Sequence, residues 1–360
     1  MNDASSVPLL SKTRYAAGLQ CAGRLYRMCF QPELATPTDA AQQARFDAGT
    51  RVGELARNLR PGGVLIDEPF FRHDDAVART RALLANGATS AICEAGFTEA
   101  GVRIRADILS TSRDGRELIE VKSSTSVKDE HLDDAAIQLA TIEAAGVSVD
   151  RVCIGHINNA CVYQGDEYVP GKLLTVEDIT AKARDVAAGV PARLATMRQM
   201  LSAGEAPRIE LGSHCHKPYD CEFYDYCRQG EPEWSIEELP GLNDERRRDL
   251  RVGEIRSIRD IPVTFRLSAA QQRVRDTVQS GRPYVSSAFL HDLARITSPA
   301  HFIDFETVAP ALPIFAGTRP YQAQPFQWSD HVLHADGSLD HYEFLADGTA
   351  DPRRAFAETP

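Results

Sequence analysis

The chain has 360 residues, of which 43% are hydrophobic and 25% charged, and its formal net charge is −11 at pH 7. It has room for two or more domains, but no apolar run approaches the about 20 residues that a membrane-spanning helix needs. The acidic balance excludes a protein that coats nucleic acid through its overall charge, but it does not exclude a nuclease, in which bound cations and a local basic groove supply the positive field. The first six residues lack the basic and apolar parts of a signal peptide, so we expect a cytoplasmic protein with no membrane partner.

Two short runs of alternating apolar and charged residues predict a β-hairpin. They are Val102–Asp107 and Leu118–Lys122, and turn-forming residues lie between them. The alternation puts Glu120 and Lys122 on one face of the second strand, and a hairpin would bring Asp107 beside them. Two carboxylates can bind a divalent cation, and a neighbouring ammonium group can orient water or stabilise charge on a phosphate. The same pattern is also typical of an exposed hairpin with a surface ion pair, so it does not by itself indicate catalysis.

The cysteines form a second pattern. Eight of them in a chain expected to be cytoplasmic do not suggest disulfides. Three are evenly spaced in an aromatic stretch that is poor in aliphatic residues, namely Cys215, Cys221 and Cys227. Three thiolates in a compact segment favour a soft metal centre, and Cys21 is the best candidate for a fourth ligand. An iron–sulfur cluster is favoured over zinc because paired C-x-x-C knuckles are missing. His214 and His216 could still complete a zinc site, and a loop without a cofactor is the remaining alternative.

A connector follows the last cysteine. Residues 230–233 are typical of a linker, and residues 236–258 resemble a helix-hairpin-helix element. In such an element the Pro240–Gly241 turn would lead into a helix whose N-terminal amide groups can hold a phosphate. The alternative is a helical connector with a solvated arginine face.

The chain changes character at residue 299. Residues 301–307 predict an apolar strand that carries Asp304 and Glu306 on one face, and residues 326–329 fit a following strand. The first strand resembles the opening motif of the DnaQ-like, RNase H-fold exonucleases, in which such a pair binds two magnesium ions. That chemistry needs further aspartates, and the residues up to 360 are too few to complete the fold. We therefore expect a truncated or vestigial domain, in which Asp304 and Glu306 are not catalytic.

The combination of an aspartate strand, a Glu-x-Lys strand and a split set of four cysteines resembles the RecB-like PD-(D/E)XK nucleases. More specifically, it resembles their iron–sulfur branch, found in CRISPR-associated exonucleases and in the AddB helicase–nuclease subunit. Nearly all of residues 8–360 resembles a bacterial family in which such a nuclease is followed by a DnaQ-like exonuclease domain. The resemblance implies an α/β fold with a restriction-endonuclease-like core, a mixed sheet flanked by helices, and an iron–sulfur cap in residues 8–229. A helical connector would span 230–298, and a partial RNase H-like segment would span 299–360.

The resemblance also implies roles for individual residues. Asp107 and Glu120 would bind Mg²⁺ or Mn²⁺ together with the carbonyl of Val121. Lys122 would position the attacking water and stabilise developing charge. Gln138 would match the family's glutamine, on a helix that apolar spacing and a stop at Gly146 support independently. Gln138 as an ordinary helix-surface residue is the alternative.

One departure concerns the third metal ligand. Many relatives carry a metal-binding histidine in a helix that reads Gly-x-x-x-His, but here Gly49 is followed by Gly53 at the histidine position and then by Glu54. Either Glu54 supplies the third ligand or the site uses fewer protein ligands and more water; Glu54 could also be a surface acid.

We therefore expect a metal-dependent deoxyribonuclease, most simply an exonuclease, that acts on single-stranded DNA or duplex ends. A [4Fe-4S] cluster would be held by four thiolates, those of Cys21, Cys215, Cys221 and Cys227. DNA repair, recombination or defence against mobile elements would be its setting, with a helicase or recombination protein as a candidate partner. The competing hypothesis is a non-catalytic or redox-responsive DNA-binding module, which predicts DNA binding without metal-dependent hydrolysis.

Overall fold

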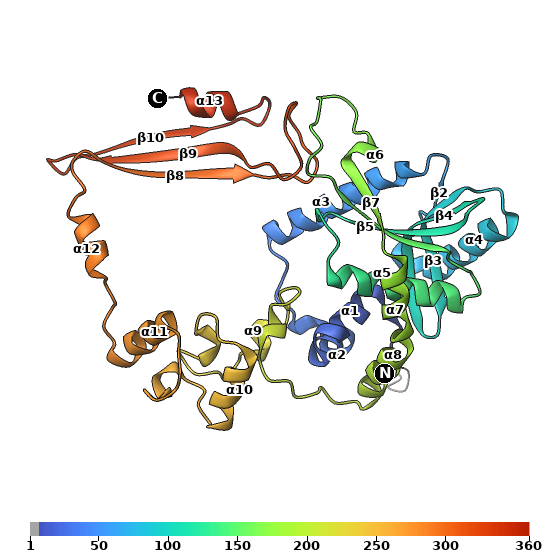
Figure 1. Cartoon of the computed structure of the whole chain (residues 1–360), viewed down its shortest axis with the longest axis horizontal. Helices are drawn as coiled ribbons and strands as arrows, with labels where there is room; N and C mark the ends of the chain where they lie inside the picture. Colours follow the sequence, from blue (N-terminus) through green and yellow to red (C-terminus); the bar gives the residue numbers. More distant parts are fainter. Residues whose placement is uncertain (1–6, 360) are drawn as a thin grey trace.

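A computed structural model describes residues 7–359 (Figure 1). The first six residues, on which the expectation about a signal peptide depends, lie outside this range. Among the described residues, no helix combines the length and the apolar character that crossing a bilayer requires.

A seven-stranded mixed sheet forms the centre of the N-terminal two thirds of the chain. Its order is β2-β3-β4-β5-β6-β7, and β1 pairs with β4. The β3–β4, β4–β5 and β6–β7 pairs are antiparallel, whereas β1–β4, β2–β3 and β5–β6 are parallel. The strands are β1 (Leu10–Ser11), β2 (Val64–Leu65), β3 (Ala91–Glu99), β4 (Val102–Ser112), β5 (Gly115–Lys122), β6 (Arg151–Ile157) and β7 (Leu174–Asp178).

Helices flank this sheet (Figure 1). Adjacent strand residues point to opposite faces, and Leu118 and Ile119 of β5 accordingly belong to two different hydrophobic clusters. The larger cluster packs against α1, α5, α7 and α8, and the smaller one packs against α3 through Val52 and Ala56. The helices are α1 (Lys12–Gln20), α2 (Ala22–Phe30), α3 (Ala40–Ala56), α4 (His73–Asn86), α5 (Asp129–Ala144), α6 (Pro170–Leu173), α7 (Thr180–Ala188), α8 (Val190–Ser202) and α9 (Tyr224–Cys227), with 3₁₀ turns η1 (Pro32–Leu34), η2 (Arg57–Leu59), η3 (Phe70–Arg72) and η4 (Ser213–Cys215).

The predicted hairpin is confirmed. Strands β4 and β5 pair antiparallel from Ile108 opposite Ile119 to Ser112 opposite Gly115, so both strands run further toward the turn than the alternating pattern indicated. The helix predicted around Gln138 is α5, and Gly146 follows it with φ of 83°, a conformation that glycine adopts without strain.

The connector has a small hydrophobic cluster of its own, which includes Ile236, Leu250 and Val278. The helix after the Pro-Gly turn carries two acids in its first turn, Asp244 and Glu245, and these oppose phosphate binding at its N-terminus. The connector's elements are η5 (Ile236–Glu238), α10 (Asp244–Val252), η6 (Ile258–Asp260), α11 (Ala269–Ser280) and α12 (Ser287–Leu293).

The C-terminal segment forms an antiparallel sheet in the order β10-β9-β8. Its elements are β8 (Ala300–Val308), β9 (Gln324–Leu333), β10 (Leu339–Leu345) and α13 (Arg353–Glu358). Strands β8 and β9 confirm the two strands predicted there. Helix α13 covers one face of the sheet, with the ring of Phe356 edge-on to Phe305 and Phe344. The chain is therefore α/β, with a mixed seven-stranded sheet flanked by helices and a separate three-stranded antiparallel sheet.

Candidate functional site

The predicted hairpin brings its three candidate residues together. The backbone N–H of Val121 donates to Asp107 Oδ2 at 2.7 Å, which fixes the Asp107 carboxylate against the end of β5. On the same strand, Lys122 Nζ lies 2.8 Å from Glu120 Oε1. The side chain of Glu120 is 1% exposed. An acid this deeply buried needs partners, so this is not an ordinary surface ion pair.

Helix α5 supplies one partner to Glu120 and one to Lys122. Gln138 Nε2 donates to Glu120 Oε2 at 2.6 Å, and the ammonium group of Lys122 donates to Asp134. Gln138 is completely buried, and its Oε1 atom has no hydrogen-bond partner among the described residues. Gln138 is therefore part of the carboxylate network and not a helix-surface residue.

Lys12 is a member of the network that the sequence analysis did not identify. It is the first residue of α1, and its Nζ lies 2.5 Å from Glu120 Oε1. Glu120 is thus held between two ammonium groups, those of Lys12 and Lys122. Nothing in the local pattern around Lys12 distinguishes it from a surface lysine, because its partner is 108 residues away.

The electrostatics of the carboxylate pair follow from burial and neighbouring charge. Burial, followed by the negative charge of Glu120, raises the pKa of Asp107 to about 7. Burial alone would also raise the pKa of Glu120, but the ammonium groups of Lys12 and Lys122 lower it below its ordinary range. Burial opposes the charge of Lys122 as well, yet Glu120 and Asp134 raise its pKa. Two carboxylates in one buried site therefore compete for positive charge.

Glu94 is a second residue that the sequence analysis missed. In the β3–β4 ladder Cys93 pairs with Ile108 and Ala95 with Ala106, so Glu94 and Asp107 lie opposite each other at a gap in the ladder, and the register is the same on both sides of the gap. Glu94 has φ of 58°, a costly conformation for a side chain of this size, and its carboxylate lies 3.7 Å from Arg57. Its charge contributes to the raised pKa of Asp107. The position of Glu94 inside the otherwise apolar first half of β3 was the feature of the sequence that could have indicated its role.

The other predicted acids lie elsewhere. Glu54 is exposed on α3, on the side of the helix away from the buried Val52 and Ala56, and has no ion pair among the described residues. Asp304 and Glu306 are exposed on β8, in the separate C-terminal sheet. The structure therefore does not bring these three acids to Asp107 and Glu120.

The four predicted cysteines line a single cavity, although Cys21 is nearly 200 residues from the others in sequence. Cys21 lies between α1 and α2, Cys215 is the last residue of η4, Cys221 lies between η4 and α9, and Cys227 ends α9. The amide of Gln20 donates to the backbone carbonyl groups of His214 and Tyr219, each at 2.7 Å, which ties the end of α1 to the cysteine loop. The cavity is lined by Cys21, Cys215, Cys221, Cys227, Arg24, Arg27, Ile209, Glu210, Leu211, His214, Phe223 and Tyr224.

The surroundings of the thiols bear on what they could bind. Burial raises the pKa of Cys215 and Cys227, and it raises that of Cys221 to about 11. His214 also lines the cavity, with Nε2 3.7 Å from Cys215 Sγ, whereas His216 turns away to Asp220 at 2.8 Å. Within residues 7–359, no three His, Cys, Asp or Glu side chains stand close enough together to hold one metal ion between them.

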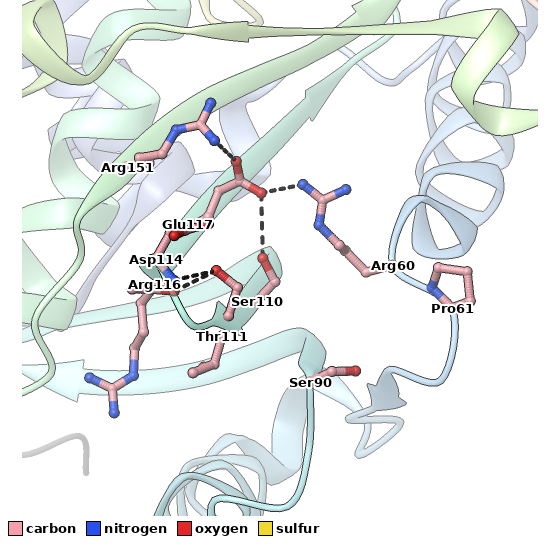
Figure 2. Close-up of a pocket in the computed structure, with 11 residues that line it drawn as sticks. Arg60, Pro61, Ser90, Ser110, Thr111, Asp114, Arg116, Glu117 and Arg151 are labelled. Carbon is pink, nitrogen blue, oxygen red and sulfur yellow. Dashed lines mark hydrogen bonds and ion pairs between the residues drawn. The ribbon is translucent and has the colours of Figure 1, made fainter.

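A different cavity, of about 300 Å³, lies at the other end of the β4–β5 hairpin (Figure 2). Glu117 of β5 stands at its centre. Its carboxylate pairs with Arg60, lies 3.2 Å from Arg151 Nη1, and accepts a hydrogen bond of 3.4 Å from Ser110. Glu117 therefore already has counter-charges, and it offers an internal comparison with Glu120 on the same strand.

Comparison with known families places one match in the C-terminal segment. Residues 301–359 match a family described as a domain of unknown function (DUF2779). The match covers β8, β9, β10 and α13, and it leaves the carboxylate network and the cysteine cavity outside it. Comparison with curated proteins gave no match.

Proposed function

We propose that this protein is a metal-dependent nuclease that hydrolyses DNA phosphodiester bonds, with a RecB-like PD-(D/E)XK site in a restriction-endonuclease-like core. One observation carries the proposal. The four residues singled out in the sequence, Asp107, Glu120, Lys122 and Gln138, lie in one buried network at the end of β5. In an exposed hairpin with a surface ion pair, the glutamate would not be buried to 1% exposure and surrounded by two lysines and a glutamine.

The residues present fit a hard divalent cation. Asp107 and Glu120 are oxygen donors that share a buried site, and the Val121 carbonyl and the unpartnered Oε1 of Gln138 add neutral oxygens. Mg²⁺ and Mn²⁺ prefer such oxygen donors. We assign the cation to Asp107, Glu120 and the Val121 carbonyl, with Glu94 as a closer third acid than Glu54.

The chemistry divides between the cation and the side chains. When bound, Mg²⁺ or Mn²⁺ would polarise the scissile phosphate and lower the pKa of a water molecule. Lys122 orients the attacking water and stabilises the charge that develops on the phosphate. Asp134 holds the Lys122 ammonium group in place, and Gln138 fixes the orientation of Glu120.

We propose further that the cysteine cavity holds a [4Fe-4S] cluster. Buried thiols that face one another repel as thiolates, so they need a positively charged centre. Four cysteines line one cavity, and their spacing lacks the paired C-x-x-C knuckles of zinc sites, which favours the cluster over zinc. Its role would be structural, because it would join α1 and α2 to the segment after η4.

A nuclease assay on the full chain tests the catalytic assignment. The protein is purified without oxygen, and labelled single-stranded and duplex DNA are incubated with Mg²⁺, Mn²⁺ or EDTA. We expect metal-dependent cleavage that Glu120→Gln and Lys122→Met each reduce by more than 100-fold, since removing one preorganised electrostatic group costs about that much.

Glu117→Gln is the matched control, because Glu117 lies on the same strand but has its own arginine partners (Figure 2). Cleavage that survives both Glu120→Gln and Lys122→Met would refute the assignment. Iron and sulfide analysis of the same preparation tests the cluster separately, and a zinc content of one per chain without sulfide would contradict it.

A further inference from the structure

A loop from the matched C-terminal segment packs against the domain that carries the carboxylate network. This loop, residues 309–323, connects β8 to β9. The backbone of Tyr163 exchanges two hydrogen bonds with it, from Tyr163 N–H to the Thr318 carbonyl at 2.9 Å and from Gly317 N–H to the Tyr163 carbonyl at 2.8 Å. Tyr168 Oη donates to the Pro313 carbonyl at 2.8 Å. The loop is therefore held by specific backbone pairing and not by chance contact.

The packing of the loop is as specific as its hydrogen bonding. Ala311 is 4% exposed and belongs to the same hydrophobic cluster as Ile119 of β5 and Val52 of α3. Thr318 is fully buried. The C-terminal segment thus contributes side chains to the core beneath strand β5, which carries Glu120 and Lys122.

Tyr321 of this loop lies next to the candidate site. Its hydroxyl group donates to the backbone carbonyl of Ser123, the residue that directly follows Lys122. Tyr321 has φ of 58°, a conformation that is costly for an aromatic residue, and the residue remains 39% exposed. The loop therefore presents a partly accessible aromatic residue at the end of β5, against the residue that follows Lys122, at the expense of backbone strain.

A basic group accompanies this aromatic face. Arg319 lies two residues before Tyr321, is exposed, and has no carboxylate within ion-pair distance among residues 7–359. An aromatic ring and an unpaired guanidinium group on one short loop match the alternating bases and phosphates of a single strand. A duplex offers the phosphates but keeps its bases stacked on each other.

We propose that residues 309–323 flank the candidate active site at the end of β5, and that Tyr321 is a specificity-determining residue that stacks on an unpaired base of single-stranded DNA. The proposal rests on the nuclease function proposed above. It gives the segment that matches a domain of unknown function a role in selecting the substrate of the neighbouring domain.

Binding measurements test this inference independently of cleavage. Fluorescence anisotropy with labelled oligo(dT) and with a blunt duplex is performed on the full chain carrying Glu120→Gln, in EDTA. Tyr321→Asn removes the ring but tolerates the positive φ, whereas Tyr321→Phe keeps the ring and removes the hydroxyl group. We expect Tyr321→Asn to weaken oligo(dT) binding roughly tenfold, as loss of one base stack does, and to leave duplex binding unchanged.

Comparison with Tyr321→Phe and two further variants sharpens the result. Tyr321→Phe and the control Tyr342→Ala, at a half-exposed tyrosine of β10, should bind oligo(dT) like the parent. Arg319→Ala should weaken binding to both DNAs and reduce the salt dependence for oligo(dT) by roughly 0.7 in log–log slope. Thermal unfolding of each variant, compared with the parent, reports on folding.

Unchanged oligo(dT) binding by Tyr321→Asn would overturn the proposal, and so would an equal loss in Tyr321→Phe, because the ring would then not be the contact. If Tyr321→Asn does not fold, Tyr321→Trp decides, since it must bind at least as tightly as the parent. Failure of the nuclease proposal is distinguishable, because it appears as absent cleavage in the unmutated chain whatever the anisotropy shows.

Discussion

Asp107→Asn should stabilise the metal-free protein at alkaline pH. The pKa of Asp107 is raised from 3.8 to about 7, first by burial and then by Glu120, so the folded state binds a proton that the unfolded chain has lost over this range. The stability that this proton contributes is fully present below about pH 4 and is lost as the pH rises to 7. A tenfold change in a protonation equilibrium corresponds to about 1.4 kcal/mol. At pH 8, ionisation of the buried Asp107 therefore lowers the free energy of unfolding by at most about 4 kcal/mol. Asparagine avoids this cost and can still accept the hydrogen bond from Val121 N–H.

The assay is urea unfolding of the full chain and of Asp107→Asn in EDTA, between pH 5 and pH 8.5. We expect the variant to exceed the parent by about 2–4 kcal/mol at pH 8 and the two curves to approach each other toward pH 5. Mg²⁺ should reverse the order at pH 8, because only an ionised Asp107 binds the cation well. A variant that is less stable than the parent at every pH, or a difference that does not change with pH, would refute the argument that Asp107 is ionised at a cost.

Three further predictions follow from the same geometry. Lys12→Met removes one of the two ammonium groups that pair with Glu120. Without metal, the substitution should lower the free energy of unfolding by about 1–3 kcal/mol. Calorimetry should show tighter Mn²⁺ binding, because one positive group no longer competes with the ion for Glu120. Gly53→His places a histidine where no atom outside its own helix backbone and chain neighbours lies within 4 Å of the new Cβ, and it replaces a poor helix former. Thermal unfolding should show no loss of stability, and Mn²⁺ should bind roughly tenfold more tightly, equivalent to about 1.4 kcal/mol; unchanged Mn²⁺ affinity would show that this helix does not face the cation. Glu117→Gln leaves two partly exposed arginines without a carboxylate; urea unfolding should report a loss of about 1 kcal/mol, reduced by solvent screening, with cleavage unchanged.

The sequence predicted those parts of the site that local periodicity encodes. The alternation in residues 102–107 and 118–122 fixes which side chains share a face, and this placed Asp107, Glu120 and Lys122 together. Gln138 could be placed on a helix because its neighbours repeat at helical spacing and Gly146 ends the run. The even spacing of Cys215, Cys221 and Cys227, in a loop rich in aromatic and poor in aliphatic residues, indicated a shared role for these three cysteines. The structure adds that Cys21 lines the same cavity.

Contacts between distant segments could not be predicted in the same way. Lys12 reaches Glu120 because α1 and α5 pack on the same face of the sheet, the face to which Glu120 of β5 points. Nothing in the sequence around a single lysine indicates such packing. Glu94 lies opposite Asp107 at a gap in the β3–β4 ladder, where Glu94 has a positive φ and the register continues unchanged on both sides. Regular strand alternation does not predict such a local interruption. Glu54, one of the alternatives for the third ligand, lies on the solvent side of α3, because Val52 and Ala56 occupy the buried side. The docking of Tyr321 depends on a loop nearly 200 residues away from Ser123.

Helix α1 joins the two chemical centres of the molecule. Its first residue, Lys12, pairs with Glu120, and the residue after its end is Cys21, which lines the cysteine cavity. Gln20 fastens the same end of the helix to the loop that carries the other cysteines. A helix of nine residues is about 13 Å long and moves as a rigid unit, so a displacement at Cys21 must be transmitted to Lys12. Loss of the proposed cluster is therefore expected to change the carboxylate network through the position of one ammonium group, even though none of the four cavity cysteines forms a hydrogen bond with Asp107 or Glu120 among the described residues.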